Sequence, residues 1–319
     1  MTKVLVTGGA GYIGANVCAT LLRKNYQVKV IDNLSSGLVS RLEGMNIEVV
    51  NGDILDRKTL NLAMKGVDAV IHLAAKKSVE ESVQNPFKYY ENNFTGTLNV
   101  IGAMAAHKVP RLIFSSTAVV YASSTADSLS EEDEKKPISP YAHSKYLSEE
   151  VIKLALIAEG ISSVSLRYFN VVGAGGPRLG DNARDNLIPK TFAAIKNGST
   201  PEIYGNDYET RDGSCIRDYI HVVDLAEVHQ LTLEFLDRNE TSEVFNVGSG
   251  KGYTVLEMMS QIRRSSGLDF DEKICPRRSG DPQSLVANIG KISSILGWKP
   301  RLTLKEMIDS SWDAEMANS

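Results

Sequence analysis

The pattern that most constrains the fold is a repeated alternation of short apolar runs with helical stretches. Apolar, partly β-branched runs occur at 3–7, 27–32, 47–53, 67–75, 111–117 and 162–170. Helical spacing follows several of them, most clearly at 14–24, 89–107 and 139–160. Strands that alternate with helices indicate a parallel sheet covered on both faces, and right-handed crossovers make it doubly wound. We therefore predict an α/β fold with a doubly wound parallel sheet.

The alternation weakens after about residue 172, which indicates a change of architecture. The stretch 171–186 is rich in Gly, Asn and Asp and is typical of a loop. Shorter elements follow it. We predict a first domain over 1–171, to which a segment near 214–236 returns, and a smaller α/β region over 172–319 that binds the substrate.

Composition limits the partners that such a fold would have. Lys and Arg total 35 and Asp and Glu total 39, so the net charge of −4 offers no basic field for nucleic acid. Three cysteines and five histidines are dispersed, which argues against a metal site or a disulfide framework. No apolar run is long enough to span a membrane, and the chain opens directly on a strand without a signal region. We expect a cytoplasmic protein with a small-molecule substrate.

The segment TGGAGYIG, residues 7–14, connects the first predicted strand to the first predicted helix. Its glycines Gly8, Gly11 and Gly14 permit a tight turn and let backbone N–H groups approach a pyrophosphate. A glycine-rich turn that binds no ligand could have the same residues. The argument for nucleotide binding therefore depends on the position of this segment between the first strand and the first helix. Asp32 ends the next strand, where an acid can bind ribose hydroxyls and repel a ribose phosphate. No arginine stands at 33–36. The pattern therefore favours NAD over NADP in a Rossmann-type domain, with Asp53 near the adenine.

A tyrosine and a lysine four residues apart suggest the chemistry. Tyr141 and Lys145 of YAHSK lie on one helix face. The tyrosine pKa of about 10 is too high for a base, but a nearby ammonium and a cationic nicotinamide would favour the phenolate. The strand RLIFSST ends in Ser115, Ser116 and Thr117, at the edge where such sheets bind ligands. We expect Thr117 to hydrogen-bond the substrate and the phenol. Two alternatives stay open: Tyr141 and Lys145 could be a solvated pair of side chains on one helix, and the three hydroxyls could only cap the strand.

Together, TGGAGYIG, the SST stretch and YAHSK resemble the extended short-chain dehydrogenase/reductase family. Further blocks, among them LRYFNVVGA, FNVGSGKGYTVLEM and LGWKP, are similar to the UDP-hexose 4-epimerases of that family, and NDYETRDGSCIRDYIHV is the most specific. The resemblance runs from residue 3 to about residue 312. It implies bound NAD, a UDP-sugar substrate, and a homodimer joined through the helix around 92–107 and the helix that carries Tyr141.

The resemblance also assigns residues to roles. Tyr141 would be the base and acid, Lys145 would lower its pKa and hold the nicotinamide ribose, and Thr117 would take a position often occupied by Ser. The NAD-binding residues would be Gly8, Gly11, Tyr12, Ile13, Gly14, Asp32, Asn33, Asp53, Ile54, Leu73, Ala74, Ala75, Lys77, Asn92, Ser115, Tyr141, Lys145 and Tyr168. The substrate-binding residues would be Thr117, Asn170, Asn186, Leu187, Tyr204, Arg217, Arg278, Asp281 and Leu285. Of these, Asp281 would bind the uridine ribose, and the two arginines suit a diphosphate.

The residues after Thr117 narrow the reaction. Sugar-nucleotide 4,6-dehydratases resemble this chain but place an Asp–Glu pair there, and the related decarboxylases carry a Glu nearby. Ala118 and Val119 can move no proton. The implied reaction is 4-epimerisation of UDP-glucose and UDP-galactose, by NAD-mediated hydride abstraction, rotation of a 4-keto sugar and hydride return.

Two alternatives stay open at this point. A 4-epimerase of UDP-N-acetylglucosamine or UDP-glucuronate would share the same motifs. At the position of Leu285, the family often has a Tyr that narrows the pocket, and small residues there accompany acceptance of N-acetylated sugars. Leu285 is intermediate in size between these two cases. The more remote alternative is a non-catalytic NAD-binding regulatory protein, against which the intact Thr117, Tyr141 and Lys145 argue.

Overall fold

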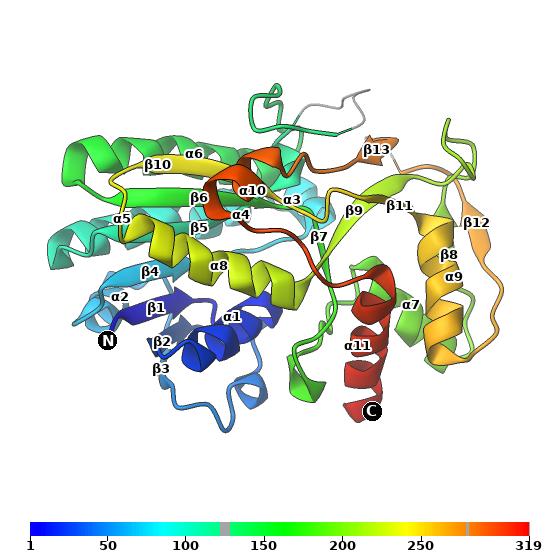
Figure 1. The fold of residues 1–319 in the computed structure, drawn as a ribbon, viewed down its shortest axis with the longest axis horizontal. Coiled ribbons are helices and arrows are strands. Elements are labelled where there is room, and N and C mark those ends of the chain that lie inside the picture. The colour runs from blue at the N-terminus through cyan, green and yellow to red at the C-terminus, as the bar shows by residue number, and fades with distance from the viewer. Residues whose placement is uncertain (122–127, 279–280, 319) are drawn as a thin grey trace. The chain divides into compact units, whose positions relative to one another are not determined.

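The computed structural model describes residues 1–121, 128–278 and 281–318 (Figure 1). The chain divides into two compact units. The first comprises Met1–Ala122, Glu134–Tyr168 and Ala226–Phe245, and the second comprises Ser123–Asp133, Phe169–Leu225 and Asn246–Ser319. The segment that returns to the first unit is thus Ala226–Phe245, which overlaps the expected segment near 214–236 only over 226–236.

The first unit is built on a seven-stranded sheet with the order β10-β6-β5-β4-β1-β2-β3. Its strands are β1 (Lys3–Thr7), β2 (Gln27–Asp32), β3 (Glu48–Asn51), β4 (Ala69–His72), β5 (Arg111–Thr117), β6 (Ser162–Tyr168) and β10 (Ser242–Val247). Neighbours from β3 to β6 pair in parallel, as where Val6 lies between Val30 and Ile71. This order is doubly wound, as predicted. The direction of winding changes between β1 and β4, which is where such sheets bind ligands.

Helices follow the strands of this sheet. They are α1 (Tyr12–Arg23), α2 (Arg57–Met64), α3 (Val79–Gln84), α4 (Pro86–Tyr89), α5 (Gly96–His107), α6 (Pro140–Glu159) and α8 (Val222–Leu236), with 3-10 turns η1 (Val39–Arg41) and η3 (Ala118–Val120). A π-helical segment, η2 (Tyr90–Thr95), joins α4 to α5. The layer of α2, α5 and α6 packs over Leu5, Val70 and Leu112. Val4 and Val6, which alternate with Leu5, are equally buried, so the strand is covered on both faces.

In the second unit, β9 (Ile216–His221) is the central strand of a small mixed sheet. It pairs in parallel with β7 (Asn170–Val172) and β13 (Ser284–Leu285) and antiparallel with β11 (Gly252–Thr254). A separate parallel pair consists of β8 (Glu202–Tyr204) and β12 (Lys273–Cys275). The helical elements are η4 (Pro177–Leu179), α7 (Leu187–Lys196), α9 (Val255–Ser266), α10 (Gly290–Leu296) and α11 (Leu304–Ala317).

The core of the second unit comes from α7, α9 and α11, through Phe192, Met258, Ile262, Met307 and Ile308. Both α9 and α11 begin with reciprocal capping boxes, in which a threonine and the glutamate three residues later satisfy backbone N–H groups. In the part of the chain that the structure describes, no helix is long and apolar enough to cross a membrane.

Candidate active site

The glycine-rich turn after β1 is packed so closely that side chains do not fit. Gly8 has φ +71°, and a Cβ built on it would lie 2.8 Å from the backbone nitrogen of Ala74. A Cβ on Gly14 would lie 2.3 Å from the carbonyl oxygen of Gly8. Among the described residues, no side chain caps the start of α1 at Gly11. The turn therefore presents backbone and the positive end of a helix, as a pyrophosphate requires, and Tyr12 and Ile13 are the first residues of that helix.

The acidic residues expected at the adenosine end are brought together at the carboxyl edge of β2 and β3. The Asp32 carboxylate accepts the N–H groups of Ala10 at 2.9 Å and Leu34 at 2.8 Å, so it also holds the glycine-rich turn. Asn33 donates its side-chain amide to Asp53 at 2.8 Å. Each carboxylate oxygen has two lone pairs, which leaves Asp32 able to accept ribose hydroxyls.

The loop after β4, which contains the expected residues Leu73, Ala74, Ala75 and Lys77, is tied to the sheet at its start. Leu73 N–H donates to the Thr7 carbonyl at 3.1 Å, and Ala74 N–H donates to the Thr7 hydroxyl at 3.2 Å. Ile54, expected near the adenine, is buried beside α5, where its carbonyl accepts the Asn99 side-chain amide at 3.2 Å.

Asn93 is a residue that the sequence reasoning missed. It lies in the π-helical segment η2, a type of distortion that is frequent at functional sites. Its buried side chain accepts the Lys76 N–H at 2.9 Å and donates to the Lys76 carbonyl at 3.0 Å, which holds the loop after β4. Its neighbour Asn92, which the prediction named, donates to Asn93 at 3.0 Å. Adjacent asparagines carry no signal that distinguishes them before the fold is known.

The expected catalytic residues come together at the start of α6 and the end of β5. Ser139 caps α6 and Pro140 opens it, which is the usual start of a helix. Thr117 ends β5, and its side chain lies near enough to the phenol of Tyr141 to act on the pKa of that phenol. Lys145 is 3% exposed, and its ammonium donates to the Ser115 carbonyl at 2.7 Å.

Burial shifts the pKa values of Tyr141 and Lys145. It raises the pKa of Tyr141, and the Thr117 side chain acts in the opposite direction. It lowers the pKa of Lys145 to about 7, against the influence of the Glu149 charge. The sequence argument expected a lowered pKa at Tyr141. The protein alone produces the reverse, because desolvation penalises a phenolate more than Thr117 stabilises it.

Tyr168, expected beside the cofactor, belongs to a second buried hydroxyl group at the end of β6. Its phenol shares a hydrogen bond of 2.5 Å with Nε2 of His229 on α8. Burial raises the pKa of Tyr168, while a hydrogen bond with the Ser115 side chain lowers it. Both tyrosines are therefore neutral at physiological pH.

The substrate residues expected in the second unit surround two arginines. The guanidinium of Arg278 lies 3.9 Å from the ring centroid of Tyr204. Arg217 of β9 is 9% exposed and pairs with Asp281. Leu285 lies opposite Arg217 in the register of β13 and β9. The structure thus places Arg278 with Tyr204, and Asp281 and Leu285 with Arg217.

The remaining substrate residues lie at the ends of elements. Asn170 begins β7 and is the register partner of Tyr219 on β9. Asn186 precedes α7 and donates to Asp181 at 2.5 Å, and Leu187 is the first residue of that helix.

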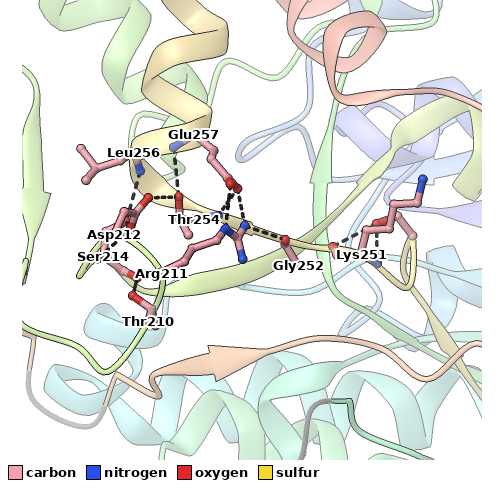
Figure 2. A network of polar contacts seen from close by, with 10 residues as sticks. Thr210, Arg211, Asp212, Ser214, Lys251, Gly252, Thr254, Leu256 and Glu257 are labelled. Carbon is pink, nitrogen blue, oxygen red and sulfur yellow. Dashed lines mark hydrogen bonds and ion pairs between the residues drawn. The ribbon is translucent and has the colours of Figure 1, made fainter.

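The loop of the NDYETRDGSCIRDYIHV block is held by a surface network (Figure 2). Arg211 donates to Glu257 through Nε at 2.7 Å and through Nη2, and to the Gly252 carbonyl at 3.0 Å. Asp212 accepts hydrogen bonds from Ser214 and from Thr254, the N-cap of α9. Arg211 and Asp212 of this specific motif therefore hold the loop that leads into β9, the strand that carries Arg217.

The expected residues separate cleanly between the units. Every expected NAD-binding residue, together with Thr117, belongs to the first unit, and all other expected substrate residues belong to the second. Over residues 1–121, 128–278 and 281–318, no three His, Cys, Asp or Glu side chains gather as metal ligands would.

Comparison with known proteins agrees with this geometry. The family model for GDP-mannose 4,6 dehydratase matches residues 5–311. A UDP-glucose 4-epimerase of Halalkalibacterium halodurans is 41% identical over 317 residues, 97% of this chain and 94% of that protein. The crystal structure of a UDP-glucose 4-epimerase from Stenotrophomonas maltophila, with bound NAD and formylated UDP-arabinopyranose, has a TM-score of 0.95 at 34% identity, over 100% of this chain and 99% of that one. A UDP-glucose 4-epimerase from Bifidobacterium longum, in complex with NAD⁺ and UDP, has a TM-score of 0.90 at 35% identity, with 99% of each chain covered.

The chain belongs to this family of nucleotide-sugar enzymes, which lies within the extended short-chain dehydrogenase/reductases. The resemblance predicted from the sequence is thereby confirmed. Within the family, the proteins that it resembles over nearly its whole length are UDP-glucose 4-epimerases.

Proposed function

We propose that this protein is an NAD-dependent UDP-glucose 4-epimerase that interconverts UDP-glucose and UDP-galactose. The observation that carries the proposal is the contact of Thr117 with Tyr141 beside a buried Lys145, followed by Ala118 and Val119. The hydroxyls can move the proton of a sugar hydroxyl. The two apolar residues that follow cannot remove water from a sugar, so the dehydratase reaction for which the family model is named lacks its acid and base here.

The proposed chemistry assigns one task to each residue. When bound, NAD would accept a hydride from carbon 4 of the sugar and return it afterwards, so no net oxidation occurs. Tyr141 takes the proton of the 4-hydroxyl, directly or through Thr117, and gives it back on the return step. Because the protein by itself raises the pKa of Tyr141, we infer that cationic charge next to the phenol is needed to form the phenolate. Lys145 provides part of that charge.

In the second unit, the charges fit a diphosphate and its ribose. Arg217 and Arg278 present guanidinium groups that can bind phosphate oxygens in pairs, and Asp281 can accept a ribose hydroxyl. We propose that these residues hold the nucleotide throughout the cycle, while the sugar is free to turn about its diphosphate linkage.

The test is to incubate the purified protein with UDP-galactose, without added NAD, and to follow the formation of UDP-glucose. Conversion is the expected result and shows that the protein retains its cofactor through purification. If NAD has to be added, retention is contradicted but epimerisation is not. Turnover of UDP-N-acetylglucosamine or UDP-glucuronate alone would establish the alternative epimerases. NAD binding without turnover of any UDP-sugar would favour the non-catalytic alternative.

We propose Leu285 as the residue that limits the size of the sugar. It lies next to Arg217 in the sheet register and is intermediate in size between Tyr and Ala. Leu285→Tyr is expected to lower the turnover of UDP-N-acetylglucosamine relative to UDP-glucose, and Leu285→Ala to raise it. A ratio that is the same in both variants as in the unmodified protein would remove this role.

We also propose that the protein is a cytoplasmic homodimer. Its three cysteines are free thiols, as a reducing compartment would keep them. The adjacent helices α5 and α6 present exposed apolar side chains at Leu98 (39%), Leu154 (61%) and Ile157 (84%). Such a face is costly to leave in water and suits a second copy of the same pair of helices.

Sedimentation velocity would test the homodimer. The joint substitution Leu154→Glu/Ile157→Glu is expected to give monomers, because it places charges on the apolar face. Leu62→Glu is the matched control, since Leu62 is similarly exposed (57%) but lies on α2. Equal dimerisation of the two variants would place the interface elsewhere, and a monomeric unmodified protein would exclude the homodimer.

A further inference from the structure

A buried ion pair lies one helical turn beyond Lys145. Glu149 continues the four-residue spacing of Tyr141 and Lys145 along α6, and it is 0% exposed. Arg167 of β6 is 1% exposed. It donates to Glu149 from Nε to Oε1 at 3.0 Å and from Nη2 to Oε2 at 2.6 Å. Neither residue has a role in the reaction described so far.

The same carboxylate also binds the neighbouring strand. Ser116 donates its hydroxyl to Oε1 of Glu149. Ser116 and Arg167 are register partners on β5 and β6, so Glu149 joins α6 to two adjacent strands at one level. The residues on either side of Ser116 are Ser115, whose carbonyl holds Lys145, and Thr117. We call Glu149, Ser116 and Arg167 together the clamp. These three residues lie at the positions that set the distance between α6, the helix of Tyr141, and the end of β5.

Among the residues that the structure describes, few charges act on Lys145 inside this core. The titratable groups around it are Tyr141 and Glu149 on its own helix, His72 on β4, and Arg167 and Tyr168 on β6. Burial lowers the pKa of His72 to about 3 and raises the pKa of both tyrosines, so these three are neutral at pH 7. Glu149 is thus the anion that favours the ammonium form of Lys145, and Arg167 of β6 pairs with the same carboxylate.

Stability alone does not explain this pair. Replacing a buried ion pair by apolar residues of similar volume is often neutral or stabilising, because desolvation of two charges offsets their attraction. The pair nevertheless lies beside the proposed catalytic residues, because Glu149 accepts a hydrogen bond from Ser116, the residue before Thr117, and its charge acts on Lys145.

We propose that Glu149 is a positioning residue of the epimerase reaction: it clamps α6 to β5 and β6, and its charge keeps Lys145 protonated. The proposal rests on the proposed function, but its electrostatic part can be measured without turnover. It predicts two separable effects, one of charge and one of position.

The charge effect is read from the pKa of Lys145 itself, by NMR of protein labelled with ¹³C at the lysine ε-carbon, with Lys145→Met used only to assign the signal. Glu149→Gln is expected to lower that pKa by on the order of one pH unit, since an adjacent opposite charge shifts a pKa by about 1–3. The alkaline limb of the kcat profile should move to lower pH by the same amount. Glu150→Gln is the matched control, because Glu150 is the next residue of α6 but is exposed and pairs with Lys153.

Two further variants guard against misfolding and separate the effects. Glu149→Gln/Arg167→Met leaves no unpaired buried charge, and it should still lower the pKa of Lys145. Ser116→Ala removes one arm of the clamp and leaves both charges, so it should lower kcat several-fold with the pH profile and KM unchanged.

The proposal is overturned if Lys145 titrates in Glu149→Gln and in the double variant as it does in the unmodified protein. It is also overturned in its positional part if Ser116→Ala has full kcat. An unmodified protein that does not turn over UDP-galactose would contradict the proposed function instead, and the titration of Lys145 would still report on Glu149.

Discussion

The catalytic end of the first unit buries its charges, whereas the second unit leaves many of its charges in contact with water. Each unit contains an arginine that donates two hydrogen bonds to a glutamate. In the first unit the side chains of Arg167 and Glu149 are 2% and 0% exposed, and in the second those of Arg211 and Glu257 are 45% and 41% exposed.

The difference shows how solvent decides what the same chemical pair does. A buried pair is costly to break, because the remaining charge has no water, while an exposed pair is screened and contributes little. The buried environment of the first unit also raises the pKa of Tyr141 and lowers the pKa of Lys145. In the second unit, Arg278 is exposed to solvent, whereas Arg217 is 9% exposed and pairs with Asp281. The predictions below test this contrast, from the largest expected effect to the smallest.

Tyr141→Phe removes the phenol that would move the proton, so kcat should fall at least about a thousandfold, equivalent to roughly 4 kcal/mol or more. Bound NAD, measured by absorbance after denaturation, should be unchanged, because the other proposed NAD-binding residues are intact. Tyr146→Phe on the same helix is the control and should retain activity. A Tyr141→Phe enzyme with near-full kcat would remove the tyrosine from the reaction.

Arg167→Met leaves Glu149 buried without its partner. The free energy of unfolding, measured by urea denaturation, should fall by about 3–5 kcal/mol. Adding Glu149→Gln in the same chain should recover much of the loss, because no charge is then left unpaired. A loss below about 1 kcal/mol in the single variant would mean that this pair behaves like a surface pair.

His72 lies in the core of the first unit, between the hydroxyls of Thr7 at 2.7 Å and Thr97 at 3.1 Å, and burial lowers its pKa to about 3. The unfolded chain takes up a proton near pH 6.5 and the folded chain does not, so stability is lost as pH falls below 6.5. From pH 6.5 to 5 this amounts to roughly 2 kcal/mol. His72→Asn keeps a donor and an acceptor, and should lose that part of the pH dependence of unfolding. Parallel curves for the two proteins would contradict the assignment.

Arg278→Ala should raise KM for UDP-galactose about tenfold, equivalent to about 1.4 kcal/mol, with little change in kcat. The reason is that an exposed guanidinium stacked on Tyr204 would bind the nucleotide equally before and during reaction. The control is Arg277→Ala, since Arg277 is the next residue but pairs with Asp207 and stacks on Tyr208. A fall in kcat at unchanged KM would place Arg278 in the chemistry instead.

Arg211→Ala should cost less than about 1 kcal/mol in the free energy of unfolding, because its pair with Glu257 is half exposed. High salt should reduce the effect further. Arg211 is the better partner to remove, since Glu257 also belongs to the capping box of α9. A loss as large as that of Arg167→Met would erase the contrast between the two units.

Much of the first unit was predictable because local and long-range signals agree there. The buried strands of a parallel sheet appear as continuous apolar runs, and the glycines of TGGAGYIG are required by the close approach of Gly8 and Gly14 to neighbouring backbone. That Tyr141 and Lys145 lie on the same face of a helix follows from their four-residue spacing and helix geometry alone. Glu149 continues that spacing, so a signal for it was present in the sequence, but the partners that define its role come from two strands.

Other features had no local signal. Asn92 and Asn93 are equivalent in the sequence, and only the π-helical turn places Asn93 against Lys76. A returning segment was predicted near 214–236, but its bounds, Ala226–Phe245, depend on where α8 and β10 pack, which is a long-range matter. The raised pKa of Tyr141 was also beyond reach, because desolvation depends on everything packed around the phenol.

By itself, the sequence determined the doubly wound fold, the family and the residue types that the chemistry requires, because periodicity, turn glycines and helix spacing are local properties of the chain. The tertiary structure alone decided which of these groups are charged. Burial is set by residues distant in sequence, and it lowers the pKa of Lys145 to about 7, keeps His72 unprotonated and leaves Glu149 and Arg167 paired away from water.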